Sequence, residues 1–251
     1  MKKCLIFLFI LRFCIFSKSL AQQGGNSSKP DTFALFDKAR NRKIPVAVYT
    51  DKSNAKANKR LAIVSHGYGQ NTGGALLAYS AISNMLASNG FVVVSIQHEL
   101  PSDSLLPTAG IPQVVRMPFW DRGADNILFV IKEFKKSHPE LDYEHITLIG
   151  HSNGGDMSAL FPQKYPGIVD KVITLDNRRM ALPRTRHPKI YTLRSSDQPA
   201  DEGVLPNIEE QKKFEITVIK LQNTIHNDMN DMGTPAQQKE INDYILTFIK
   251  Q

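Results

Sequence analysis

Short runs of β-branched and other apolar residues alternate along the chain with longer segments in which apolar residues recur three and four positions apart. The short runs lie at residues 44–50, 60–66, 91–97, 145–152, 171–176, 189–195 and 216–222. The spacing typical of one-sided helices occurs at residues 76–88, 124–136 and 240–250. Runs that are apolar almost throughout are typical of a parallel sheet that helices cover on both faces. The pattern therefore predicts an α/β fold with a mainly parallel sheet, in which the first strand or two run antiparallel.

The first 21 residues, MKKCLIFLFILRFCIFSKSLA, have the features of a secretory signal peptide. They begin with two lysines after the initial methionine, continue as an apolar run, and end with the small residues Ser19 and Ala21 at the −3 and −1 positions of a cleavage site. Arg12 and Lys18 leave too few uninterrupted apolar residues for the ~20 that a membrane-spanning helix needs. The sequence therefore predicts a secreted or periplasmic protein without a stable membrane span after cleavage.

Residues 22–31 are polar and rich in Gly and Ser, so we expect a flexible lead-in there. Residues 32–251 then form one domain, because α/β domains routinely run to roughly 200–250 residues. The signal segment holds four of the 31 basic residues, which leaves 27 against 24 acidic ones. This small surplus of basic residues, without a block of like charges, does not indicate a nucleic-acid-binding surface. Nothing in the sequence indicates an oligomeric state.

Both cysteines, Cys4 and Cys14, lie in the signal segment. The remaining domain therefore has no disulfide framework, no thiolate metal site and no cysteine nucleophile. It contains no H-E-x-x-H motif and no phosphate-binding P-loop, and His226 with Asp228 and Asp231 lacks a convincing further metal ligand. We expect neither a metal nor a cofactor.

Ser152 lies in the sequence GHSNG at residues 150–154, between a predicted strand and a helical stretch. A G-x-S-x-G sequence alone is weak evidence, but the strand–turn–helix setting strengthens it. Such a sharp turn strains the serine backbone and brings neighbouring chain close to the two glycine positions. It presents the hydroxyl outward, at a helix N-terminus that favours developing negative charge. We interpret Ser152 as a nucleophile rather than a turn residue.

A serine hydroxyl needs a nearby base, usually a histidine whose tautomer is fixed by a carboxylate. Beyond Ser152 the sequence has two histidines, His187 and His226. His187 lies just ahead of a predicted strand, at the amino edge of the sheet. His226 follows the last predicted strand, at the carboxyl edge, where such sheets carry their chemistry. His226 is the candidate base, and the alternative is a loop histidine hydrogen-bonded to Asp228 or Asp231.

Three aspartates are candidates for the carboxylate partner of that histidine. Asp197 lies just past the penultimate predicted strand, in LRSSDQPAD, and Asp176 ends the strand before it, in ITLDNRRM. Asp201 is a third and less favoured position. Asp176 could instead pair with a neighbouring arginine, and Asp197 could cap the following turn. The residues alone leave the choice open.

The sequence HGYG at residues 66–69 directly follows a predicted strand. The backbone N–H of Tyr68 and that of Asn153, the residue after the nucleophile, are expected to converge on the oxyanion of a tetrahedral intermediate. One such donor contributes roughly 2.7–4 kcal/mol to catalysis. The glycines on either side of Tyr68 let the substrate approach. The alternative is an ordinary loop with two flexible residues.

These motifs resemble the α/β-hydrolase superfamily, and within it the dienelactone-hydrolase-like, polyester-cutinase-like and platelet-activating-factor acetylhydrolase-like esterases. The resemblance runs through IPVAVY, VSHGYGQNTGG, LIGHSNGG, ITLDNRRMALP and TIHNDM, nearly the whole predicted domain. It implies the α/β-hydrolase fold and esterase activity. The acetylhydrolase-like pattern implies Asp176 as the acid, whereas the cutinase-like pattern implies Asp197. The C-terminal disulfide of the polyester cutinases is missing here, which weakens a polymer-degrading function.

The segment at residues 98–120, HELPSDSLLPTAGIPQVVRMPFW, is long for a connection in a compact domain. It is too apolar for a mere linker, and it follows the third predicted strand at the carboxyl edge. We expect it to line or cap a pocket for the acyl or alcohol group, with Met117 and Trp120 binding substrate. Arg116 and Arg122 either bind an anionic substrate group or form surface salt bridges. Whether residues 99–119 act as a lid stays open.

Together these features predict a serine hydrolase that cleaves small-molecule or lipid-like carboxylic esters through an acyl-enzyme. A peptidase or an acyltransferase could use the same triad. A non-catalytic binding protein on a hydrolase scaffold is a third possibility, and the intact set of serine, histidine and aspartate argues against it. Neither the physiological ester nor the preferred acyl length can be read from the sequence, because a fold does not identify a substrate.

Overall fold

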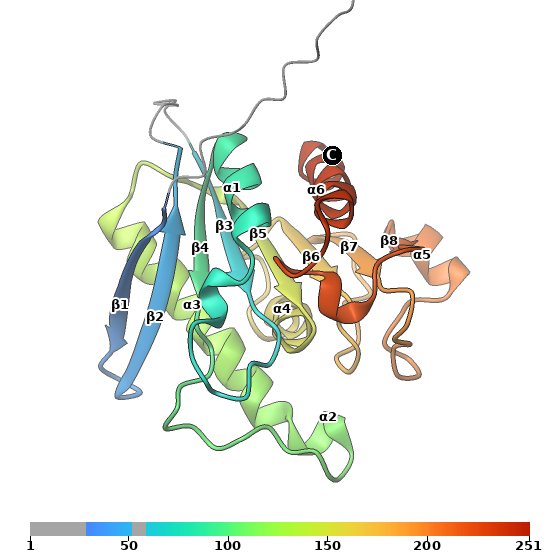
Figure 1. The fold of residues 1–251 in the computed structure, drawn as a ribbon, viewed down its shortest axis with the longest axis horizontal. Helices are drawn as coiled ribbons and strands as arrows, with labels where there is room; N and C mark the ends of the chain where they lie inside the picture. The colour runs from blue at the N-terminus through green and yellow to red at the C-terminus, as the bar shows by residue number, and fades with distance from the viewer. Residues whose placement is uncertain (1–28, 52–58) are drawn as a thin grey trace, which may run out of the picture.

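The structure, a computed structural model, describes residues 29–51 and 59–251. The predicted signal peptide and most of the predicted lead-in lie outside the described residues. The described chain forms one eight-stranded sheet in the order β1-β2-β4-β3-β5-β6-β7-β8 (Figure 1). Its strands are β1 (Asp31–Asp37), β2 (Arg42–Tyr49), β3 (Arg60–Ser65), β4 (Phe91–Ile96), β5 (Asp142–His151), β6 (Lys171–Leu175), β7 (Lys189–Arg194) and β8 (Thr217–Lys220).

The sheet is antiparallel at one edge and parallel elsewhere. β1 pairs with β2 and β2 pairs with β4, both antiparallel, whereas all other neighbours pair in parallel. The expected mainly parallel sheet with antiparallel first strands is confirmed. β1 has no counterpart among the predicted strands, because its sequence DTFALFD is mostly exposed at the sheet edge and forms no continuous apolar run. It begins at Asp31, which the sequence pattern assigned to the lead-in.

Helices cover both faces of the sheet (Figure 1). They are α1 (Ser80–Ser88), α2 (Pro112–Val115), α3 (Met117–Ser137), α4 (Asn153–Lys164), α5 (Ile208–Phe214) and α6 (Pro235–Lys250). Successive strand residues point to opposite faces. In β3, Leu61 and Ile63 belong to the hydrophobic core shared with α3 and α4, whereas Ala62 and Val64 belong to the core shared with α1 and α6. Burial on both faces explains why the strands are continuous apolar runs.

Helices α3 and α5 depart from the sequence-based expectation, and so does the short α2. α3 begins at Met117, within the segment predicted to be a loop, and has a proline in its first turn, where proline is well tolerated. α5 follows β7 in a region without a recognised helical period. A capping box between Asn207 and Glu210 starts it, with the Asn207 side chain accepting the Glu210 N–H and the Glu210 side chain accepting the Asn207 N–H.

Helix α1 is capped by a residue from far along the chain. Its own N-cap residue, Tyr79, makes no side-chain cap. The carboxylate of Asp231 instead accepts the backbone N–H groups of Ser80 at 2.8 Å and Ala81 at 3.0 Å, and the Asp231 N–H donates to the Ala78 carbonyl at 2.9 Å. A carboxylate here satisfies free N–H groups and interacts favourably with the helix dipole. The loop after β8 is thus bound to the start of α1.

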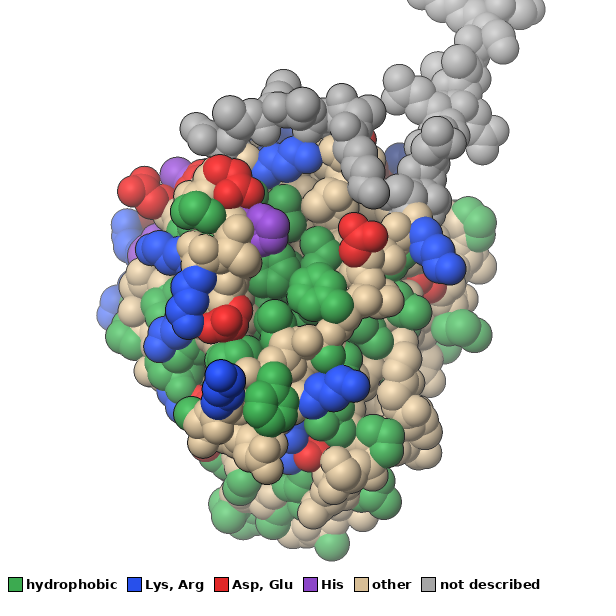
Figure 2. Space-filling view, turned by 90° about the vertical axis from the view of Figure 1, so that its left-hand side faces the viewer, with side chains coloured by type: hydrophobic (Ala, Val, Ile, Leu, Met, Phe, Trp, Pro, Cys, Tyr) green, Lys and Arg blue, Asp and Glu red, His purple; other side chains and the backbone are tan. Residues whose placement is uncertain are grey.

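The surface on the β1 side mixes charges of both signs. Figure 2 shows basic and acidic side chains interspersed over this face, and β1 adds the exposed rings of Phe33 and Phe36. Interspersed charges produce no strong field of one sign across this face. Within residues 29–51 and 59–251, no helix has the length and apolar character needed to cross a membrane.

Candidate active site

Ser152 lies at a sharp turn between β5 and α4, at the carboxyl edge of the sheet. Its backbone has φ 51° and ψ −120°, and a positive φ is uncommon for any residue other than glycine. A Cβ on Gly150 would collide with the carbonyl oxygen of Gly154, and a Cβ on Gly154 would collide with that of Ser65. Backbone strain persists only where the surroundings impose it, and it clusters at functional sites. The strand–turn–helix setting expected for Ser152 is therefore present.

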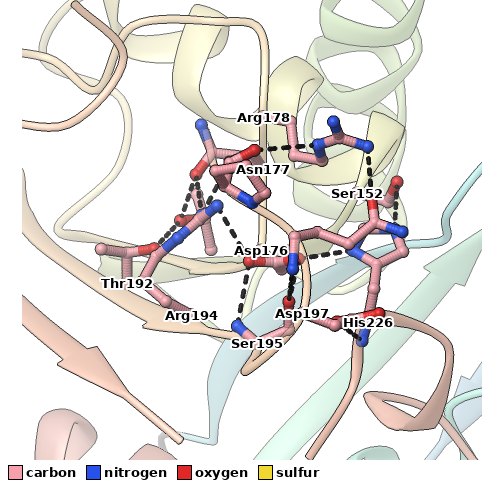
Figure 3. Close-up of polar contacts among 12 residues, drawn as sticks. Ser152, Asp176, Asn177, Arg178, Thr192, Arg194, Ser195, Asp197 and His226 are labelled. Carbon is pink, nitrogen blue, oxygen red and sulfur yellow. Dashed lines mark hydrogen bonds and ion pairs between the residues drawn. The ribbon is translucent and has the colours of Figure 1, made fainter. Parts of the chain in front are cut away.

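The hydroxyl of Ser152 faces the imidazole of His226, which follows β8 in the 3₁₀ helix η2 (His226–Asp228). Ser152 Oγ and His226 Nε2 are 2.9 Å apart, and His226 Nδ1 lies 2.5 Å from Asp176 Oδ2 (Figure 3). Because a carboxylate only accepts, Nδ1 donates to it and Nε2 is left to accept the serine hydroxyl. This is the tautomer that a general base toward Ser152 requires. Residues from three separate strand ends thus form one hydrogen-bonded chain.

Asp176, directly after β6, is fully buried. Its Oδ1 accepts the Ser195 backbone N–H at 3.0 Å and lies 2.8 Å from Arg194 Nη2, while its Oδ2 accepts the Ser195 hydroxyl at 2.7 Å. Burial opposes ionisation, but the hydrogen bonds from His226 and Ser195 and the charge of Arg194 outweigh it and hold the pKa of Asp176 below its ordinary value. An ionised Asp176 can orient the imidazole and stabilise a positive charge on it.

The other two candidate acids occupy different positions. Asp197 is exposed, and its Oδ1 accepts the backbone N–H of His226 at 2.7 Å. Asp201 lies 3.4 Å from Arg179. The structure therefore places Asp176 on the imidazole of His226 and Asp197 on the main chain of the same residue, and it brings Asp201 to neither. The sequence could not separate the first two, because both follow neighbouring strands at the same sheet edge.

His226 is also held through its backbone carbonyl. His151 Nε2 donates to the His226 carbonyl oxygen at 3.0 Å, and the Tyr79 hydroxyl donates to His151 Nδ1 at 2.7 Å. The backbone N–H of Gly67 donates to the same hydroxyl at 3.1 Å. Burial lowers the pKa of His151 to about 3, so its imidazole is neutral, as these donor and acceptor roles require. The residue before the serine in GHSNG thus positions His226, a role that the motif does not reveal.

Tyr68 and Asn153 line the same cavity as Ser152. Asn153 is the first residue of α4, so its N–H has no partner within the helix, and among the described residues no acceptor is found for the Tyr68 N–H. The Asn153 side chain is held at both ends, because Trp120 Nε1 donates to its Oδ1 at 2.8 Å and its Nδ2 donates to Glu99 Oε1 at 2.9 Å. Two free amides beside a serine hydroxyl can bind a developing oxyanion.

Trp120 and Met117 do not occupy the substrate-binding positions expected of them. Trp120 has no exposed surface, because its indole points from α3 into the hydrophobic core that α3 and α4 share with the sheet. Met117 packs against the same core and does not line the cavity beside Ser152. The prediction of direct substrate contact is therefore wrong for Trp120, whose link to the site is its hydrogen bond to Asn153, and has no support for Met117.

A second buried carboxyl, that of Glu99, connects Asn153 to His66. His66 Nδ1 donates to the Gly67 carbonyl at 2.6 Å, and its Nε2 accepts the His98 backbone N–H at 3.0 Å, so the ring is neutral. Glu99 Oε2 lies 3.5 Å from that Nε2. Burial raises the pKa of Glu99 to about 7 and lowers the pKa of His66 to about 4. A protonated Glu99 fits this position, since an ionised one would face a nitrogen lone pair.

A cavity of about 130 Å³ opens beside Ser152. It is lined by Tyr68, Leu106, Thr108, Arg116, Ser152, Asn153, Asp156, Arg178 and Arg179. Asp156 Oδ1 accepts three backbone N–H groups, those of Arg178 at 3.2 Å and of Arg179 and Met180 at 2.9 Å each. Burial nevertheless raises the pKa of Asp156 to about 6. His226 is outside the lining, so the cavity extends from Ser152 on the side away from His226.

The segment at residues 98–116, between β4 and α3, borders this cavity through side chains that include Leu106 and Arg116. The Leu106 backbone N–H donates to the Tyr68 hydroxyl at 3.0 Å, and Arg116 Nε donates to the Pro107 carbonyl at 3.0 Å. The segment therefore lies against the pocket, where the sequence placed it, and hydrogen bonds tie it to the HGYG loop and to itself.

The arginines of the site were only partly foreseen. Arg116 lines the cavity, whereas Arg122 does not and instead pairs with Asp103 at 3.5 Å. Sequence reasoning did not propose Arg178 and Arg179 as binding residues. They lie two and three positions after Asp176, just past the end of β6, so the same strand-end position that singled out that aspartate was a signal for them too.

The histidines and carboxylates of the site pair with one another rather than converge on a common point. Among the described residues, no three or more His, Cys, Asp or Glu side chains are grouped so that they could hold a metal ion. The hydrogen-bonded chain from Asp176 through His226 suffices in principle to activate a serine.

No family model matches the chain, and no curated protein matches it. Solved structures match over most of its length. A fungal esterase from Rhizomucor miehei is 14% identical with a TM-score of 0.64, and the match covers 94% of this chain and 86% of the esterase. A dienelactone hydrolase-like promiscuous phosphotriesterase from metagenomic libraries is 12% identical with a TM-score of 0.63, and the match covers 89% of this chain and 98% of the phosphotriesterase. An α/β serine hydrolase without lid from Xanthomonas campestris is 13% identical with a TM-score of 0.58, and the match covers 89% of this chain and 94% of that hydrolase. The chain has the α/β-hydrolase fold, as the resemblance implied.

Proposed function

We propose that the protein is a serine hydrolase that cleaves carboxylic esters through an acyl-enzyme. The observation that carries the proposal is the chain from Asp176 through His226 to Ser152, with distances of 2.5 and 2.9 Å. The two free amides beside Ser152 and the α/β-hydrolase fold support the same reaction class. The structural neighbours described as esterases and as an α/β serine hydrolase agree with it.

Acylation begins when Ser152 Oγ attacks the carbonyl carbon of the ester. The hydroxyl proton passes to His226 Nε2, and Asp176 stabilises the imidazolium through the Nδ1–H bond. The carbonyl oxygen becomes an oxyanion, which accepts hydrogen bonds from the N–H groups of Tyr68 and Asn153. The bond from carbon to the leaving oxygen then breaks, and the leaving alcohol takes the proton from His226 Nε2.

Deacylation repeats these steps with water in place of the serine hydroxyl. Water gives a proton to His226 Nε2 as its oxygen attacks the acyl carbon. Collapse of the second tetrahedral intermediate breaks the bond to Ser152 Oγ, which takes the proton back. Each turnover consumes one ester and one water and forms one carboxylic acid and one alcohol, and the enzyme returns to its initial protonation state.

In this proposal Asp176 is the triad acid, because it is the carboxylate that bonds the imidazole. Asp197 is a positioning residue, since it holds the main chain of the base and not its ring. Glu99 and Trp120 likewise position Asn153, whose amide faces the substrate.

The experiment that tests the proposal compares Ser152→Ala with Ser137→Ala, an exposed serine at the end of α3. We expect Ser152→Ala to abolish hydrolysis of p-nitrophenyl butyrate and labelling by a fluorophosphonate probe, with an unchanged circular dichroism spectrum. Ser137→Ala should keep both the hydrolysis of the ester and the labelling by the probe. Full activity in Ser152→Ala would refute the proposal.

A further inference from the structure

Three arginines line the small cavity beside Ser152: Arg116 at the end of the 98–116 segment, and Arg178 and Arg179 after β6. The lining contains one carboxylate, that of Asp156, and three backbone N–H groups already occupy one of its oxygens. The cationic side chains of the lining therefore exceed the anionic ones by two. Hydrolysis of a neutral ester does not need this surplus, because the free amides already serve the oxyanion.

Arg116 and Arg179 keep donors that no described residue occupies. Arg116 donates from Nε to the Pro107 carbonyl at 3.0 Å, and among the described residues its Nη1 and Nη2 have no acceptor. Arg179 Nη1 lies 3.4 Å from Asp201 Oδ2, a long and partly exposed contact, and its other two guanidinium nitrogens make no hydrogen bond within the described chain. A guanidinium is always charged, and its planar fork of donors matches a carboxylate.

Arg178 is held more firmly than the other two. Its Nε donates to the Pro199 carbonyl at 3.2 Å, and its Nη1 donates to Gln198 Oε1. It lines the cavity together with Ser152, and Figure 3 draws no dashed line from its second terminal nitrogen. The contacts with residues 198 and 199 thus fix the plane of the guanidinium beside the nucleophile. This is the preorganisation that a charge-recognising group needs.

The position of the cavity decides which part of an ester the arginines face. The leaving alcohol takes its proton from His226 Nε2, so it must lie on the His226 side. The lining includes Ser152, Tyr68 and Asn153, and His226 is outside it. The acyl group is bonded to the carbon that Ser152 attacks, so it is the part that extends into the cavity.

From this arrangement we propose that the acyl group carries a carboxylate at its far end, so that the substrates are mono-esters of short dicarboxylic acids. The inference rests on the proposed function and names its substrate class. The volume of about 130 Å³ is below the roughly 300–1,000 Å³ of typical small-molecule pockets, which favours a short chain. Arg116, Arg178 and Arg179 are then specificity-determining residues, and Leu106 contacts the methylene groups.

The test uses two matched substrates, p-nitrophenyl butyrate and the mono-p-nitrophenyl ester of glutaric acid, each corrected for its rate without enzyme. We expect kcat/KM of the wild type to be about tenfold or more higher for the glutarate ester, as charge-assisted hydrogen bonds allow. Arg116→Gln, Arg178→Gln and Arg179→Gln should each reduce this preference severalfold. Arg116→Lys, which keeps the charge but not the planar fork, should recover part of it.

The control is Arg186→Gln, because Arg186 is exposed, pairs with Glu215 at 2.8 Å and lies outside the cavity lining. It should leave the preference unchanged. A wild-type preference for butyrate, or equal losses on both esters in the three cavity variants, would overturn the inference while the esterase proposal stands. If neither ester is hydrolysed and the fluorophosphonate probe does not label Ser152, the proposed function itself fails. Thermal melting of each variant separates loss of fold from loss of recognition.

Discussion

Asp197 accepts the backbone N–H of His226 at 2.7 Å and leaves the imidazole of that residue to other partners. Its carboxylate therefore fixes the loop that carries His226 without contacting the ring of that residue. Asp176, one strand away, bonds the ring instead. Two aspartates at neighbouring strand ends act on different atoms of one histidine, so their removal should have different consequences.

Replacing Asp176 with Asn should lower kcat for a p-nitrophenyl ester by roughly 10³–10⁴, because an amide neither fixes the tautomer nor stabilises the imidazolium. Asp197→Asn should lower kcat by about tenfold or less, since an amide oxygen can still accept the His226 N–H. Steady-state kinetics of the two variants measure the difference. Losses of similar size would contradict this division of roles.

The buried carboxyl of Glu99 should make the free energy of unfolding depend on pH. Its pKa is raised from the ordinary 4.5 to about 7, so its contribution to stability is complete below about pH 4.5 and is lost as pH rises toward 7. Glu99→Gln keeps hydrogen-bonding capacity toward Asn153 and His66 but does not titrate. Between pH 4.5 and 7.5 the stability of the variant relative to the wild type should rise by on the order of 1–3 kcal/mol.

Urea unfolding at several pH values measures this change. The matched control is Glu133→Gln, at a partly exposed position on α3 where Glu133 pairs with Lys136. A Glu99→Gln stability difference that stays constant across the pH range would show that Glu99 is ionised in the folded protein.

Tyr79→Phe removes a hydroxyl that accepts from Gly67 and donates to His151. Because both partners are left with an unsatisfied polar group, the variant should lose about 1–3 kcal/mol of unfolding free energy. It should also lower kcat, since His151 then holds the His226 carbonyl less rigidly. Tyr143→Phe is the control, because that hydroxyl bonds the His138 carbonyl in an exposed setting, and it should change neither quantity appreciably.

A methyl group in the HGYG loop should have effects that depend strongly on position. A Cβ at Gly67 would lie 2.9 Å from His151 Nδ1 and 3.3 Å from Ser152 Cβ, whereas at Gly69 the nearest atom, Ala75 Cβ, is 3.5 Å away. Gly67→Ala should therefore lower kcat/KM by about tenfold or more, and Gly69→Ala should cause a clearly smaller loss. Parallel assays of the two variants make the comparison, and a larger loss at Gly69 would contradict it.

The positions of Ser152, His226 and both aspartates could be predicted because parallel strands present their carboxyl ends at one edge. The choice between Asp176 and Asp197 could not. It depends on the direction in which the His226 ring points. Contacts with Arg194 and Ser195, which lie 18 and 19 positions beyond Asp176 along the chain, help fix the carboxylate that meets the ring.

Trp120 shows a different limit. Its place in a long apolar segment favoured a role in the pocket, but the helical spacing seen at residues 124–136 extends back through Ala124 to Trp120. Helix α3 begins at Met117, so Trp120 faces the core. The periodicity of apolar residues is least informative at the ends of helices and strands. Here the unrecognised start of α3 led to Trp120 being predicted as a binding residue instead of a core residue.

The cap that Asp231 places on α1 links catalytic competence to completion of the fold. The same loop carries His226 and supplies the acceptors for the Ser80 and Ala81 amides. Fraying of α1 and displacement of His226 therefore belong to one local opening event. Slow hydrogen exchange at those two amides should report the fraction of molecules with the base in place. A nascent chain in which this loop has not yet closed on α1 has no His226 beside Ser152. On the proposed mechanism such a chain is inert toward esters until the loop has docked.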